Sequence, residues 1–104
     1  MKVAFLASSL VSAYWNGAAT YYRGVVRAMH ERGHEVTFYE PDAYARQQNR
    51  DIPDPEWAKV VVYDATLDGV EQALDAGMAA DIVVKTSGVG VFDEWLEAAV
   101  VARR

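Results

Sequence analysis

The chain has 104 residues, the size of one domain with a core of its own, and we expect residues 1–104 to form a single domain. It contains no cysteine, which excludes disulfides and thiolate metal sites, and its net charge of -5 argues against a nucleic-acid partner, which usually selects a basic face. No apolar run reaches the ~18 residues of a membrane span, and a cysteine-free composition fits a reducing compartment, so we expect a cytoplasmic protein.

Apolar segments of strand length alternate with helical patterns along the chain. Residues 3–7 are apolar on both faces, as in a buried parallel strand, and residues 17–32 follow with a helical apolar pattern. We expect Asn16 to cap this helix and Gly33 to end it in the left-handed conformation. A second strand is expected over 35–39, and Pro41 is expected to stop it.

The second half repeats the alternation. A short helix over 42–49 and a proline loop anchored by Trp57 precede a strand at 59–63. Thr66 is expected to cap a helix over 67–76 that Gly77 closes, and a fourth strand is expected at 81–85. The last helix, over 91–102, is predicted to bury Phe92, Trp95, Leu96, Ala99 and Val100.

This order of elements predicts an α/β fold. Right-handed crossovers would give a parallel four-stranded sheet in the order 3-2-1-4 with helices on both faces, which is one three-layer half of a Rossmann-like fold. The switch point then lies between the first and fourth strands, bordered by two small-residue loops at 8–20 and 86–90. A thin sheet with an open edge also predicts a homodimer, or a longer protein that continues beyond Arg104.

The loop between the first strand and the first helix is the main candidate site. Its small residues would let a phosphate reach the free N–H groups at the helix N-terminus, although small residues also serve simply to pack a helix on a sheet. Its aromatic residues are suited to stack on a sugar or a base, and a lysine ends the fourth strand beside the second loop. The candidate binding residues are Ser8, Ser9, Tyr14, Trp15, Asn16, Gly17, Ala18, Ala19, Thr20, Lys85, Thr86, Ser87 and Gly88.

Three motif-based alternatives fail on their chemistry. The residues from His30 to His34 spell H-E-x-x-H, but a helix that ends at Gly33 cannot present both histidines to zinc on one face, so no metal ion is expected. A phosphoacceptor receiver domain needs an acidic pair where this chain has Ser8 and Ser9. The dinucleotide fingerprint G-x-G-x-x-G is absent, although Glu40 stands where an acidic residue would meet a ribose hydroxyl; a solvated glutamate at the strand end is the alternative.

One stretch also carries a family resemblance. Residues 8–24, SSLVSAYWNGAATYYRG, resemble the opening of the spore-maturation CgeB-like glycosyltransferases. Residues 32–40, RGHEVTFYE, resemble that family and the two-domain GT-B glycosyltransferases in general, and residues 85–93, KTSGVGVFD, extend the likeness.

The resemblance implies that this chain is the amino-terminal, acceptor-side domain of an enzyme that transfers a sugar from a nucleotide-sugar to an acceptor small molecule or glycan. Gly17–Thr20 would approach the donor diphosphate, and the domain alone would be inactive. No cofactor is expected, and the catalytic base is not identified; Asp64 and Glu40 are candidates by position only. A nucleotide-binding module and a non-catalytic assembly domain remain as alternatives.

Overall fold

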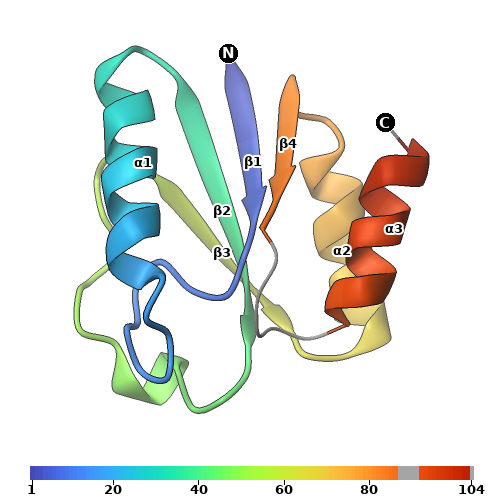
Figure 1. Ribbon diagram of the computed structural model, residues 1–104, viewed down its shortest axis with the longest axis horizontal. Coiled ribbons are helices and arrows are strands. Elements are labelled where there is room, and N and C mark those ends of the chain that lie inside the picture. Colours follow the sequence, from blue (N-terminus) through green and yellow to red (C-terminus); the bar gives the residue numbers. More distant parts are fainter. Residues whose placement is uncertain (87–91, 104) are drawn as a thin grey trace.

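The computed structural model describes residues 1–86 and 92–103, and within them it contains four parallel strands and three α-helices (Figure 1). The strand order is β3-β2-β1-β4, so the expected α/β fold is confirmed. In chain order the elements are β1 (Lys2–Leu6), α1 (Ala19–Glu31), β2 (Glu35–Asp42), the 3-10 helix η1 (Gln47–Asn49), β3 (Lys59–Asp64), α2 (Leu67–Gly77), β4 (Ile82–Lys85) and α3 (Asp93–Arg103).

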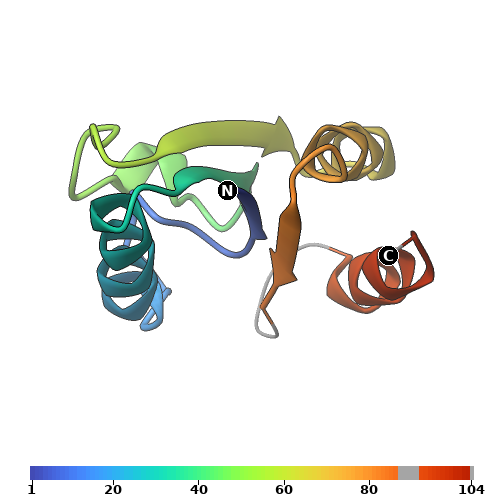
Figure 2. The ribbon, with the colours of Figure 1, turned by 90° about the horizontal axis from the view of Figure 1, so that it is seen from above.

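The sheet separates two apolar layers because the side chains of each strand alternate between its faces. Val3 and Phe5 of β1 pack towards α1, whereas Ala4 and Leu6 pack towards α2 and α3. Figures 1 and 2 show α1 on one side of the sheet and the other two helices on the opposite side. Tyr22 of α1 is buried, as expected from its place in the helical pattern. β1 is therefore covered on both faces, as its unbroken apolar run indicates.

Two of the expected helix boundaries are confirmed by their geometry. Gly33 follows α1 with a φ of 89°, in the left-handed region that only glycine adopts readily. The Thr66 hydroxyl accepts a hydrogen bond from the Gly69 N–H at 3.1 Å and so caps α2. Trp57 packs against the core on the α1 side, which anchors the preceding loop as expected.

Other expected boundaries are wrong, because neighbouring elements decide them. β2 continues through Pro41 to Asp42. β1 ends opposite Tyr39, so β3 is the only strand beside Pro41 among the described residues. The backbone N–H that proline lacks is tolerated at such a position. Gly77 belongs to α2 rather than closing it. The predicted helix over 42–49 shrinks to η1, since Tyr44 and Ala45 take φ values of 56° and 57°.

The burial predicted for the last helix is confirmed for Leu96 and in part for Ala99 and Val100, which pack against the core, but it is wrong for Phe92 and Trp95. Leu96 is the one fully buried side chain among the described residues of α3, while Phe92 and Trp95 are 45% and 40% exposed. α3 packs on α2 and on the edge strand β4, so only a narrow stripe of it faces the core. Within residues 1–86 and 92–103, no helix is long and apolar enough to cross a membrane.

Candidate functional site

The predicted switch point lies where β1 and β4 pair side by side, with α1 on one face of the sheet and α2 and α3 on the other. The chain leaves β1 into the β1–α1 loop, which comprises residues 7–18, and leaves β4 at Thr86. The Tyr22 hydroxyl and Thr86 Oγ1 lie 3.1 Å apart and join α1 to the end of β4. Two predicted site residues, Ser87 and Gly88, lie outside the described residues.

Glu40 holds the first part of the β1–α1 loop through hydrogen bonds from its carboxylate. Its side chain is completely buried at the end of β2, and its carboxylate accepts three hydrogen bonds: from Ser9 Oγ at 2.6 Å, from the Leu10 N–H at 3.0 Å and from Gln47 Nε2 at 2.6 Å. The alternative of a solvated glutamate is therefore wrong. Both oxygens are occupied by the loop and η1, so Glu40 is not presented to a ribose or a substrate hydroxyl, and Ser9 is buried with it.

Asn16 closes the middle of the loop instead of capping α1. Its Nδ2 donates to the carbonyl oxygens of Ser9 and Ser12, both at 2.9 Å, and its Oδ1 accepts a bond from Ser8 Oγ at 2.7 Å. The predicted cap is wrong because this side chain is turned back into the loop. α1 starts two residues later than expected, with Ala18 at the N-cap position and no side-chain cap in this described segment.

Arg46 supports the tip of the loop, and the sequence analysis missed it. Its side chain is buried, with 1% of its surface exposed, and it donates from Nε to the Tyr14 carbonyl at 3.3 Å and from Nη2 to the Trp15 carbonyl at 2.9 Å. Burial lowers the pKa of Arg46 from its usual value, while the negative charge of Glu40 acts in the opposite direction. An arginine in a polar segment looks like a surface residue, so no local signal distinguishes it.

A third anchor fixes the side of the loop that faces α1. Arg23 donates from Nε to the Leu10 carbonyl at 2.7 Å, and its two terminal nitrogens reach the Asp51 carboxylate at 2.6 and 2.9 Å. The same carboxylate accepts the Ala13 N–H at 3.1 Å. The hydrogen bond from Arg23 holds the pKa of Asp51 below its usual value of 3.8. Together the three anchors contact the loop at points between Ser9 and Trp15.

The anchored loop leaves a distinct set of groups towards solvent. Trp15 is 80% exposed with a φ of 47°, and Tyr14 is 41% exposed. A Cβ atom added at Gly17 would meet nothing within 4 Å, and Thr20 is exposed in the first turn of α1. Ala18 is half-buried and Ala19 is fully buried, so Ala19 packs the helix on the sheet rather than offering its side chain to a ligand.

The remaining candidates lie in different surroundings. Lys85 has only 6% of its side chain exposed; its Nζ donates to the Thr86 carbonyl and pairs with Asp93 Oδ1 at 2.8 Å. Its charge is thus matched by the start of α3. Asp64 is exposed at the end of β3, with β2 between it and β1 in the sheet. His30 lies in the last turn of α1, whereas His34 lies beyond Gly33. Residues 1–86 and 92–103 hold no group of three or more side chains suited to a metal ion.

No family model, curated protein or solved structure matches this chain.

Proposed function

We propose that this chain is the amino-terminal, acceptor-side domain of a cytoplasmic glycosyltransferase that uses a nucleotide-sugar, and that the β1–α1 loop contacts the donor diphosphate. One observation carries the proposal. Three buried or partly buried polar anchors, at Glu40, Arg46 and Arg23, fix a loop whose outer side consists of small and aromatic residues. Several polar contacts that fix the conformation of one loop are expected where the backbone itself binds a ligand.

The first turn of α1 has the chemistry that a diphosphate needs. A helix N-terminus offers backbone N–H groups and the positive end of the helix dipole. The described first turn of α1 contains no acidic residue and no side chain that caps it, so no side chain there competes with an anion, although the Ala19 N–H already donates to the Asn16 carbonyl at 3.2 Å. The absence of a Cβ at Gly17, where open space surrounds the backbone, permits close approach of phosphate oxygens.

The exposed aromatic residues suit the neighbouring parts of such a donor. The indole of Trp15 stands out from the loop while its own carbonyl is held by Arg46, so the ring is displayed on a fixed backbone. Tyr14 packs edge-on against it, with ring centroids 6.1 Å apart. Flat apolar faces of this kind stack on sugars and bases.

The test is a titration of the 104-residue chain with UDP-glucose and, separately, with inorganic pyrophosphate, followed by the amide resonances of Gly17–Thr20. We expect both ligands to shift these resonances with millimolar affinity, about -4 kcal/mol, because the second wall of a two-domain site is missing. Gly17→Asp should abolish the shifts by placing a carboxylate where phosphate binds.

Gly17→Asn is the matched control, since it adds the same volume without the charge. Both side chains enter open space, so the thermal melts of the two variants should match that of the parent chain. Equal binding by the Asp and Asn variants, or shifts confined to other parts of the chain, would remove this loop from donor binding.

A further inference from the structure

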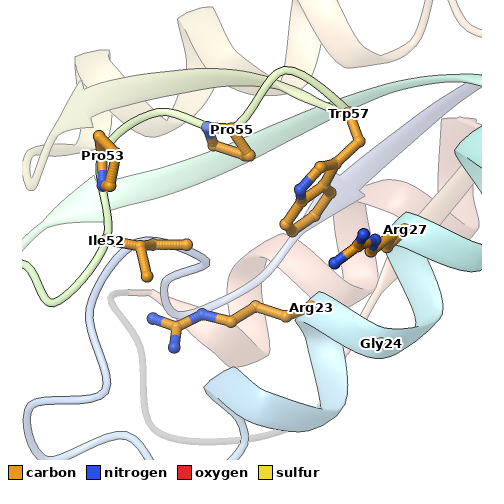
Figure 3. Close-up of a pocket in the computed structure, with 7 residues that line it drawn as sticks. All are labelled: Arg23, Gly24, Arg27, Ile52, Pro53, Pro55 and Trp57. Atoms are coloured by element: carbon orange, nitrogen blue, oxygen red, sulfur yellow. The ribbon is translucent and has the colours of Figure 1, made fainter.

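A concave surface lies beside the β1–α1 loop, between α1 and the loop that connects η1 to β3 (Figure 3). Its volume is about 460 Å³, within the ~300–1,000 Å³ of small-molecule sites. Helix α1 supplies Arg23, Gly24 and Arg27, and the connecting loop supplies Ile52, Trp57 and two prolines. Apart from Arg23, which anchors the loop, these residues have no part in the proposed donor contact.

Gly24 forms part of the pocket wall on α1. It lies at an exposed position inside the helix, where glycine is less favourable than alanine. A Cβ atom added at Gly24 would meet nothing within 4 Å, so no close contact demands a glycine there. The missing side chain instead keeps this wall of the pocket open, as a site that receives a ligand against the helix backbone requires.

The two arginines of the pocket differ in how firmly they are held. Arg23 is fixed by Asp51 and by the Leu10 carbonyl, so its positive charge is already matched. Arg27 pairs with Glu31 at 3.5 Å, and the two side chains are 65% and 66% exposed. Exposed helix pairs of this kind contribute little to stability, so Arg27 can exchange Glu31 for a better anion.

The rest of the lining is apolar and flat. Figure 3 shows the guanidinium of Arg27 near the indole of Trp57 at one end of the pocket, with Ile52 and Pro53 at the other. Trp57 is half-buried and already packs on the core, so its ring is held in place without a ligand. A fixed indole beside an exchangeable guanidinium recognises a planar ring that carries an acidic group.

We propose that this pocket binds a small aromatic carboxylate, with its ring against Trp57 and the prolines and its carboxylate on Arg27. A single negative charge fits, because Asp51 already neutralises the other arginine of the lining. Guanidinium groups hold carboxylates through two parallel hydrogen bonds, which fixes the orientation of the ring. This inference does not rest on the proposed glycosyltransferase function, and a failure to bind nucleotide-sugars leaves it intact.

The test uses 2-naphthoate as the probe and 2-naphthamide, its uncharged counterpart, as the comparison, both titrated into the full chain and followed by amide and indole N–H resonances. We expect naphthoate to shift both the Gly24 amide and the Trp57 indole and to bind about tenfold more tightly than the amide. The Gly24 signal is required because Trp57 also borders a neighbouring groove that His30 and Lys59 line.

Four variants test the charge and the shape of the pocket separately. Arg27→Gln should reduce naphthoate binding to the level of naphthamide, whereas Arg32→Gln, an exposed position of the same helix region outside the pocket, should keep the tenfold preference. Gly24→Leu should block both probes by filling the pocket. Gly24→Ala should bind more weakly yet melt at a higher temperature, which guards against a Leu variant that fails to fold.

Equal binding of the two probes to the parent chain would overturn the proposal. So would an unchanged preference in Arg27→Gln, or full binding in a folded Gly24→Leu or Gly24→Ala variant.

Discussion

Glu40 offers the sharpest test of how the β1–α1 loop is held. In Glu40→Gln the side chain keeps its shape but loses its charge, and one acceptor oxygen becomes an NH₂ group. Oε2 accepts from both Ser9 and Gln47, and Oε1 accepts from the Leu10 N–H. Whichever way the new amide turns, its nitrogen faces a donor. Ser9 Oγ already accepts the Ser12 N–H at 3.1 Å, and if it also accepted from the new amide, its own hydrogen would lose the Glu40 oxygen as its acceptor.

The expected cost follows from these contacts. A hydrogen bond to a charged group contributes ~1.5–3 kcal/mol, and a buried donor left without an acceptor costs ~1–3 kcal/mol. Partial rearrangement by Gln47, which can flip its own amide, reduces the sum. We expect Glu40→Gln to lower the free energy of unfolding by about 2–3 kcal/mol, a large fraction of the ~5–15 kcal/mol typical of a domain. The melting temperature should fall by at least ~8 °C.

The assay is urea unfolding followed by circular dichroism, with hydrogen exchange of the Leu10 amide as a local readout. Glu35→Gln is the control, because Glu35 begins the same strand but is exposed. The control should change stability by less than ~0.5 kcal/mol. Exchange at Leu10 should accelerate in Glu40→Gln and not in the control. If the two variants lose equal stability, the buried carboxylate does not hold the loop and the preorganisation argument fails.

Four further outcomes test other parts of the structure. Gly33→Val should cost ~1 kcal/mol or more in urea unfolding because its φ is 89°; a loss of a few tenths would contradict the left-handed cap. Gly69→Ala should lower the free energy of unfolding by ~1–3 kcal/mol or more, since its Cβ would lie 2.2 Å from a backbone oxygen at the end of β3. Gly77→Ala, with contacts no closer than 3.6 Å, should be neutral or raise stability by up to ~1 kcal/mol. Equal effects of the two variants would refute the packing of α2. Asp51 has a lowered pKa in the folded chain, so its contribution to stability is present above its usual pKa of 3.8 and lost as the pH falls through the folded pKa. Asp51→Asn should flatten this loss in melts recorded across pH, by a small amount because the Asp51 carboxylate is exposed. Finally, we expect the chain to self-associate in sedimentation velocity and Trp95→Glu to weaken this, and a parent chain that stays monomeric at high concentration would speak against it.

The fold could be predicted because its signals are local and mutually consistent. Apolar runs of strand length, alternating with helical patterns, leave few arrangements once crossovers are right-handed. The caps at Gly33 and Thr66 were predictable for the same reason, since backbone conformation and a near hydrogen bond decide them. Pro41 and Trp95 were misjudged because their surroundings depend on where β1 ends and on how little of α3 faces the sheet.

The position of the candidate site could be predicted from the sequence, but the side chains that hold the loop in place could not. The small residues that mark the loop are visible as a pattern, whereas the groups that hold it come from distant positions. Glu40 and Arg46 are 31 residues from their nearest loop partners, Ser9 and Trp15. A glutamate at a strand end and an arginine in a polar segment are ordinarily solvated, and only the folded chain shows that both are buried.

The polar frame of the loop follows from what the loop exposes. The loop packs on the core through Leu10 and Val11, which are fully buried, whereas its exposed tip is held by hydrogen bonds to buried polar groups. Arg23 belongs to both the loop and the pocket: its Nε donates to the Leu10 carbonyl of the β1–α1 loop, and its side chain lines the pocket together with Trp57. A ligand seated in that pocket contacts the same side chain that positions the loop, so the loop and the pocket are parts of one structural unit built on the first turns of α1.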